Sequence, residues 1–158
     1  MMQYEQGKTF EAENLLTLRK KMTPQQIQQE MIAISHFLKE SSITKIGSII
    51  TATHGVEMIK QEQIFDMEIM IPIDKCSIED DKYLLKPQLK IVNAIYIRHE
   101  GNPQGIQNLL IQLQKDMEFH KLTQITTAYN VNIKEPSGPK GLNNMITDIY
   151  IGVNPNIL

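Results

Sequence analysis

Two carboxylic acids stand at matching places in two strand-like runs of this 158-residue chain. Glu68 lies in FDMEIMIPI and Asp148 lies in MITDIYIGV. Successive side chains of a strand point to opposite faces, so each acid shares its face with the residues two positions away. These include Met70 beside Glu68 and Tyr150 beside Asp148. A carboxylate among apolar and aromatic groups is typical of a pocket for a small organic ligand, such as a hydrophobic cation, which the charge would orient.

The plain alternative is that both acids face solvent, as acids on the open side of antiparallel strands commonly do. Two features favour the pocket. The acids recur at equivalent positions of the two repeats, and the strand faces that carry them are less polar than a face that only contacts solvent would be. Tyrosines of neighbouring strands are candidates for the pocket wall, although each is equally well explained as a partly buried strand tyrosine with its hydroxyl at the rim. The expected ligand-binding residues are Asp148, Glu68, Tyr150, Tyr129, Tyr96 and Met70.

A strand, helix, strand, strand unit carries the first acid. Its helix begins at Thr23, a capping residue, with Pro24 at the first helical position and Gln26 completing a capping box. Apolar residues then recur at spacings of three and four, which predicts an amphipathic helix ending around Lys39 to Ser42. Short runs of apolar and β-branched residues predict the strands, at residues 13–22, 46–56 and 64–73.

The second acid lies in a repeat of the same unit. Asn102 caps a second amphipathic helix, with Pro103 at its first position. Pro24 and Pro103 are 79 residues apart, and Glu68 and Asp148 are 80 apart, so two independent landmarks agree within one residue. The strands of this repeat are predicted at residues 88–101, 124–135 and 145–153, with a loop rich in Pro and Gly at 136–144.

The duplication predicts an α+β fold in which two β-α-β-β repeats form one antiparallel sheet with two long helices on one face. The helices would cover the purely apolar face of each strand, so Glu68 and Asp148 would point outward on the open side, where a ligand would bind. The length suits one core, and we expect a single domain over residues 1–158. Its parts are repeat one at about 14–73, a linker at 74–87 and repeat two at about 88–153.

Composition and charge restrict the partners. The chain is 41% hydrophobic and 22% charged, with a formal net charge of -2 and its Lys and Arg residues scattered, which disfavours direct nucleic-acid binding. The single Cys76 excludes an internal disulfide, and the first residues lack the regions of a secretory signal, so a cytoplasmic location is expected. No apolar run approaches the roughly 18 to 20 residues that span a bilayer, so no membrane association is expected.

Neither a metal nor a cofactor is expected. The four histidines form no pair with the i, i+4 spacing of helical metal ligands, and we interpret them as structural or surface residues. His54 with Gly55 is interpreted as the turn that ends the strand at 46–56. Ser and Thr are frequent, but the G-x-S-x-G pattern of a nucleophile elbow is absent from the sequence.

The double strand, helix, strand, strand repeat resembles the GyrI-like small-molecule-binding family, which includes DNA gyrase inhibitory proteins and effector-binding domains of multidrug-responsive transcription regulators. The resemblance is carried by AIYIRHEGNPQGIQNLLIQL and by ITTAYNVNIKEP followed by TDIYIGV, and it extends from about Asn14 to Val153. It implies that Asp148 stands where the family has its pocket acid, usually Glu. The chain departs from the family at Gly152, in place of a strand-end Pro that Pro72 retains in the first repeat, and it has no Trp.

The leading hypothesis is a non-enzymatic protein that binds a small organic molecule between the repeats on the open face of the sheet, resembling a stand-alone GyrI-like member without a DNA-binding domain. Two alternatives stay open. One is a protein-interaction adaptor or inhibitor, gyrase-inhibitor-like or secretion-associated, in which the same groove holds a protein partner. The other is a small hydrolase that uses the pocket acid. The loop at 136–144 is either a lid over the pocket or a tolerated insertion.

Overall fold

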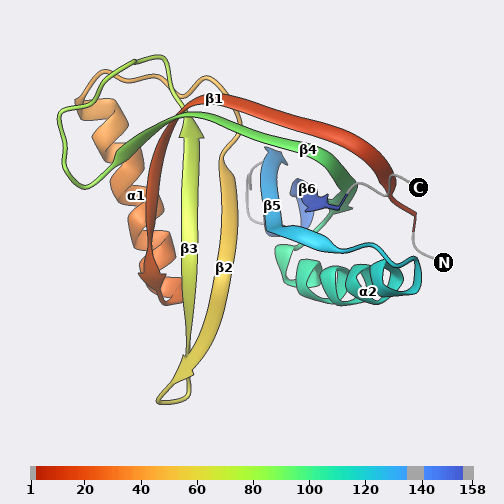
Figure 1. The fold of residues 1–158 in the computed structure, drawn as a ribbon. Coiled ribbons are helices and arrows are strands. Elements are labelled where there is room, and N and C mark those ends of the chain that lie inside the picture. Colours follow the sequence, from red (N-terminus) through yellow and green to blue (C-terminus); the bar gives the residue numbers. More distant parts are fainter. Residues whose placement is uncertain (1–2, 135–140, 155–158) are drawn as a thin grey trace. The chain divides into compact units, whose positions relative to one another are not determined.

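The structure, a computed structural model, describes residues 3–134 and 141–154. These residues form antiparallel strands and two helices, which confirms the predicted α+β class (Figure 1). In chain order the elements are β1 (Glu5–Met22), α1 (Pro24–Glu40), β2 (Ile50–Ile59), β3 (Glu62–Pro72), β4 (Leu84–Glu100), the 3₁₀ turn η1 (Pro103–Gly105), α2 (Ile106–Phe119), β5 (Gln124–Lys134), the 3₁₀ turn η2 (Gly141–Asn144) and β6 (Ile146–Val153).

The chain forms two compact units, and the boundaries between them fall within β1 and β4. The first-repeat unit comprises Ala12–Leu89, and the second-repeat unit comprises the residues up to Glu11 together with those from Lys90 onward. In the first-repeat unit β3 lies between β1 and β2, and in the second-repeat unit β6 lies between β4 and β5. All four pairings are antiparallel, so each repeat builds the same three-stranded arrangement.

Helix α1 begins where the sequence predicts. The Thr23 side chain accepts a hydrogen bond from the backbone N–H of Gln26 at 3.2 Å, and the Gln26 side chain accepts one from the Thr23 N–H at 2.9 Å. This capping box satisfies two backbone donors that would otherwise lack partners. In the second-repeat unit Asn102 caps the short turn η1, which leads into α2, so the predicted helix starts as a 3₁₀ turn.

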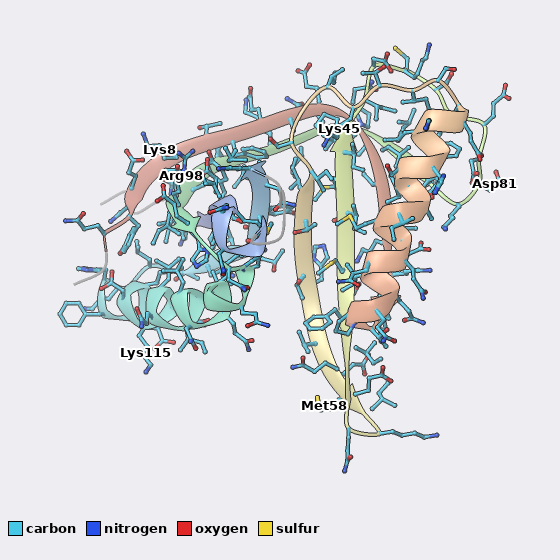
Figure 2. The ribbon with its side chains drawn as sticks, turned by 180° about the vertical axis from the view of Figure 1, so that it is seen from behind. Lys8, Lys45, Met58, Asp81, Arg98 and Lys115 are labelled. Carbon is cyan, nitrogen blue, oxygen red and sulfur yellow. The ribbon has the colours of Figure 1, made fainter. Side chains whose placement is uncertain are left out.

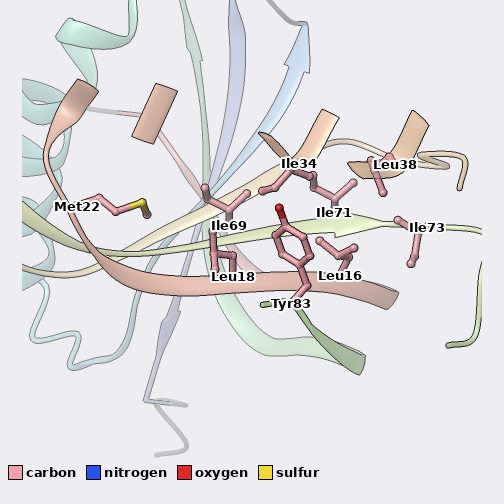
Figure 3. Close-up of a cluster of buried hydrophobic side chains, with 9 residues drawn as sticks. All are labelled: Leu16, Leu18, Met22, Ile34, Leu38, Ile69, Ile71, Ile73 and Tyr83. Carbon is pink, nitrogen blue, oxygen red and sulfur yellow. The ribbon is translucent and has the colours of Figure 1, made fainter. Parts of the chain in front are cut away.

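The two helices pack on equivalent faces of their own units. In the first-repeat unit the buried α1 residues Ile34 and Leu38 contact the apolar face of β3, as Figure 3 shows. Seventy-nine residues further on, Leu113 and Met117 of α2 occupy the same positions in the second core. The apolar faces of β3 and β6 therefore lie under the helices, as strand alternation predicts. The matching strand residues are Ile69, Ile71 and Ile73 in one unit and Ile149, Ile151 and Val153 in the other.

Backbone conformation repeats as closely as the cores. Asn14 in β1 and Asn93 in β4 both have positive φ, at 56° and 53°. Asn is one of the few residues that tolerate this left-handed region. Each Asn amide donates to the carbonyl that ends the third strand of its unit, at 2.7 Å for Ile73 and 3.1 Å for Val153. The duplication thus extends to local backbone geometry.

The predicted turn at His54 and Gly55 is wrong. Strand β2 continues through these residues to Ile59, and the pairing register with β3 shifts between Thr53 and Gly55. His54 is therefore the extra residue of a β-bulge, a feature that redirects side chains without ending a strand. The turn itself is formed by Lys60 and Gln61, both with positive φ. A bulge recurs in β5 between Asn132 and Lys134, at the equivalent place.

Other boundaries also differ from the sequence predictions. Strand β1 begins at Glu5, well before residue 13, and β4 begins at Leu84, inside the expected linker. Of the expected loop at 136–144, residues 136–140 lie outside the described part of the chain, and Gly141–Asn144 form η2. Among the described residues, no helix combines the length and apolar character needed to cross a membrane.

Candidate functional site

Asp148 of β6 is held by three hydrogen bonds from β4, the neighbouring strand. Arg98, directly opposite in the pairing register, donates from Nε to Oδ1 at 2.7 Å and from Nη2 to Oδ2 at 3.0 Å. The Tyr96 hydroxyl donates to Oδ1 at 2.9 Å. Asp148 is only 5% exposed. A buried carboxylate is costly unless it is paired and hydrogen-bonded, and this bidentate pair with a third donor meets that requirement.

Aromatic rings surround this carboxylate. Tyr96, Tyr150 and Tyr129 stand opposite one another across β4, β6 and β5, so they share one face of the sheet with Asp148. The Tyr96 and Tyr150 rings are 5.1 Å apart, and the Phe10 ring of β1 lies 4.7 Å from Tyr150. We call this set, Asp148 with Arg98, Tyr96, Tyr150, Tyr129 and Phe10, the acid cluster.

The charge states of the acid cluster follow from its contacts. Burial, and then the hydrogen bond to Asp148, raises the pKa of Tyr96, and burial also raises the pKa of Tyr150. The hydrogen bond from Arg98 to Asp148 raises the pKa of the Arg98 guanidinium further above its ordinary value. At neutral pH the phenols of Tyr96 and Tyr150 are therefore uncharged and lie beside the positively charged guanidinium of Arg98.

A groove of about 690 Å³ adjoins the acid cluster within the second-repeat unit. Its size is typical of small-molecule pockets. Residues of β4, the C-terminal part of α2 and the N-terminal segment line it, among them Tyr4, Glu5, Tyr96, Arg98, Asp116 and His120. Because Tyr96 and Arg98 belong to both features, a molecule in the groove would contact the two groups that hold Asp148.

The far wall of the groove contains a second hydrogen-bonded acid. Asp116 of α2 accepts a hydrogen bond from the Tyr4 hydroxyl and lies 3.7 Å from Nε2 of His120. Burial, followed by the hydrogen bond and charge of Asp116, raises the pKa of Tyr4 to about 12. Tyr4 thus ties the N-terminal segment to α2. The sequence reading assigned no role to Tyr4 or Asp116.

Glu68 occupies the equivalent place in the first-repeat unit and is 8% exposed. Its partners differ from those of Asp148. The His54 ring contacts Oε1 through Nε2 at 3.0 Å, and Lys86 of β4 donates to Oε2 at a longer 3.4 Å. The bulge at His54 places the imidazole in this position, whereas Ile133 stands at the equivalent bulge in β5. Met70, two residues after Glu68, is fully buried.

The first-repeat unit also has an arginine opposite its acid, but that arginine binds elsewhere. Arg19 faces Glu68 across β1 and β3, as Arg98 faces Asp148. Its guanidinium instead forms a two-point contact with Asp66, at 3.1 and 3.0 Å. The second-repeat unit has Ile146 where the first has Asp66, 80 residues earlier. With no competing acid at that position, Arg98 pairs with Asp148.

The structure brings four of the six expected ligand-binding residues onto one face of the second-repeat unit: Asp148, Tyr150, Tyr129 and Tyr96. Glu68 and Met70 occupy the matching face of the first-repeat unit. The plain alternative, that both acids face solvent, is wrong, because both are buried in ion pairs or hydrogen bonds.

Sequence reasoning missed Arg98, Phe10, His54 and Lys86. Arg98 could have been found by aligning β4 with β6, since the register places it opposite Asp148. Among the residues that the structure describes, no group of three or more His, Cys, Asp or Glu side chains is arranged to hold a metal ion.

Solved structures with the same fold were found at low sequence identity. The C-terminal domain of EcmrR has a TM-score of 0.68 and 15% identity, with 97% of this chain and 99% of that domain covered. In the EcmrR–DNA complex the TM-score is 0.72, and this chain spans 59% of the EcmrR chain. SAV2435 bound to tetraphenylphosphonium has a TM-score of 0.55 and 11% identity, covering 98% of this chain and 95% of that one.

A hydrolase from Listeria innocua is similar to the same extent, with a TM-score of 0.56, 12% identity and coverage of 93% and 92%. No protein-family model matches the chain, and no curated protein matches it. At these identities the likeness establishes the fold alone.

Proposed function

We propose that this chain is a non-enzymatic, cytoplasmic small-molecule-binding protein of the GyrI-like effector-binding type, and that its ligand is an aromatic organic molecule. The observation that carries the proposal is that Tyr96 and Arg98, which hold the buried Asp148, also line the groove of about 690 Å³. A ligand in the groove would bury apolar surface against Tyr4 and Tyr96, the tyrosines that line it, and would be oriented by a fixed polar group.

The fold neighbours agree with this class of function. EcmrR is a DNA-bound protein whose C-terminal domain has the same fold, and SAV2435 binds tetraphenylphosphonium, an aromatic ion. We extend to this chain only the ability to bind a small aromatic molecule. Glu68 and Met70 are buried in the first-repeat unit, where Lys86 and His54 hold the acid, so we propose no direct ligand contact for them.

Binding is favoured over hydrolysis by the state of Asp148. A general base must accept a proton from a water molecule within hydrogen-bonding distance. Both Asp148 oxygens already accept hydrogen bonds from Arg98, and Oδ1 accepts another from Tyr96. Fold neighbours include hydrolases, but we propose that this acid serves as a structural and binding group.

A ligand screen by thermal unfolding tests the proposal. A ligand that binds the folded state raises the melting temperature, and the rise grows with the logarithm of its concentration once this exceeds the dissociation constant. We expect hits among small aromatic molecules, and we expect Tyr96→Ala, which removes a ring from the groove lining, to abolish their effect. Glu11→Gln is the matched control, because Glu11 forms an exposed pair with Lys90 outside the cluster. No shift with any aromatic compound, or equal shifts in Tyr96→Ala, would contradict the proposal.

A protein-interaction role is the second candidate, and one observation favours it. Val56, Met58 and Ile59 are each about half exposed near the end of the β2–β3 hairpin. Figure 2 shows Met58 at the end of this hairpin, beyond helix α1. Exposed apolar groups of this kind often mark contact surfaces. If the hairpin mediates a contact, Met58→Glu should abolish a complex detected by native mass spectrometry while leaving ligand-induced thermal shifts unchanged.

A further inference from the structure

Arg98 occupies the place that the charge of a cationic ligand would take. Its guanidinium contacts both oxygens of Asp148, and Asp148 is 5% exposed. A cation from solution could reach this carboxylate only by displacing Arg98. The exchange would replace a bidentate, hydrogen-bonded ion pair by one without such geometry, so it would gain little.

We propose that Arg98 determines the charge class of the ligand: the wild-type site takes uncharged aromatic molecules and discriminates against hydrophobic cations. This inference rests on the proposed function and adds a specificity-determining residue to it. It narrows the sequence-based expectation, in which Asp148 would itself meet a ligand's positive charge.

The groups left for a ligand suit an uncharged molecule. The Arg98 side chain is 44% exposed, and its Nη1 group takes no part in the two contacts with Asp148. Guanidinium N–H groups donate hydrogen bonds to carbonyl or phosphoryl oxygens and stack on aromatic rings. Tyr96 and Tyr150 are partly exposed beside it. A neutral molecule with aromatic rings and one polar oxygen would therefore use both kinds of group.

The first-repeat unit indicates how Arg98 could be diverted. There, Arg19 stands opposite Glu68 but binds Asp66 instead. The residue equivalent to Asp66 is Ile146. The substitution Ile146→Asp would provide Arg98 with a second acid at the corresponding position and would leave Asp148 free to meet a ligand cation. Arg98→Gln would remove the competing cation directly.

Isothermal titration calorimetry with two probes of similar shape tests the inference. Tetraphenylphosphonium carries a positive charge, and triphenylphosphine oxide is uncharged with one acceptor oxygen. For the wild type we expect the oxide to bind at least tenfold more tightly than the cation. Arg98→Gln should bind the cation at least tenfold more tightly than the wild type does, and Ile146→Asp should change the preference in the same direction.

A double variant assigns the effect to the acid. Adding Asp148→Asn to Arg98→Gln should abolish the gain in cation affinity, because no carboxylate remains. If Arg98→Gln and Ile146→Asp still bind the oxide but bind the cation no more tightly than the wild type, the inference is wrong while the proposed function stands. If neither probe binds any variant, the proposed function fails and the inference fails with it.

Discussion

Arg98 and Arg19 occupy equivalent places in the two repeat units, each opposite a buried acid, but Arg98 binds the acid that it faces whereas Arg19 binds Asp66. Arg19 pairs with the partly buried Asp66, and the Glu68 that it faces is held by His54 and Lys86. The two cores, the helix positions and the left-handed asparagines are the same in both units. The framework has therefore been retained while the partners of the acid have changed.

Two positions contribute to this difference. Asp66 in one unit corresponds to Ile146 in the other, which decides whether the arginine has a competing acid. His54 at the bulge of β2 corresponds to Ile133 at the bulge of β5, which decides whether an imidazole reaches the acid. Substitutions at a strand residue and at a bulge residue thus change the partners of a buried acid while the fold of the unit is retained.

The largest expected effect tests the equivalence of the two cores. Ile69 and Ile149 are both completely buried under a helix. Replacing either one by Ala removes buried methyl groups and leaves a cavity, which should lower the free energy of unfolding by about 3 kcal/mol. Urea denaturation followed by circular dichroism measures both variants. A large loss in one unit with almost none in the other would show that the cores are not equivalent.

The next largest effect concerns the partners of the two acids. Lys86→Gln should cost less than about 1 kcal/mol, because its contact with Glu68 is long, Lys86 is 37% exposed and His54 remains as a partner. Arg98→Gln should lower stability more, since it leaves the buried Asp148 with Tyr96 as its remaining hydrogen-bond donor. Denaturant midpoints compare the variants. Equal losses of stability in the two variants would show that Asp148 and Glu68 do not differ in how strongly they depend on their partners.

Within the acid cluster, removing a single hydroxyl group should have a smaller effect than Arg98→Gln. Tyr96→Phe abolishes the hydrogen bond to the Asp148 carboxylate and should cost about 1.5 kcal/mol. Tyr150→Phe is the matched control, because burial and nearby charges, without a side-chain hydrogen bond, account for its raised pKa. We expect that variant to remain within about 0.5 kcal/mol of the wild type by thermal unfolding. If the control lost as much as Tyr96→Phe, the hydrogen bond would not explain the result.

The smallest effect is a pH dependence at the groove. The folded state raises the pKa of Tyr4 from 10.0 to about 12, so it holds the phenolic proton more tightly than the unfolded chain does. The resulting stabilisation is fully present below pH 10 and is lost as the pH rises towards 12. The difference in stability between wild type and Tyr4→Phe should therefore shrink over this range in denaturation series. A difference independent of pH would contradict the bond to Asp116.

Much of the fold was predictable because it depends on local signals. The capping box at Thr23, the apolar stripes of the helices and the alternation in β3 and β6 are all properties of a few consecutive residues. The bulge at His54 was missed because His-Gly also suits a turn, and only pairing with β3 distinguishes the two. The N-terminal extension of β1 was missed because its polar residues carry little strand signal.

The candidate site was predictable in its residue types but not in its pairing. Alternation correctly put Asp148 and Tyr150 on one face, and the aromatic residues of β4 and β5 joined them. The partner of Asp148 depends on strand register, which is set by tertiary packing and cannot be read from either strand alone. The sequence reading consequently assigned a free acid where the structure has an ion pair with Arg98.

The most direct test of small-molecule binding at the acid cluster is an NMR titration of protein carrying ¹³C-labelled tyrosine rings, assigned with single Tyr→Phe variants, against triphenylphosphine oxide and tetraphenylphosphonium. Tyr83, which packs on Phe37 in the first-repeat unit, is the internal control. We predict saturable shifts of the Tyr96 and Tyr150 rings with at least one probe, while Tyr83 stays unchanged. Shifts confined to Tyr83, or no saturable shift of Tyr96 and Tyr150 with either probe, would contradict the proposed site.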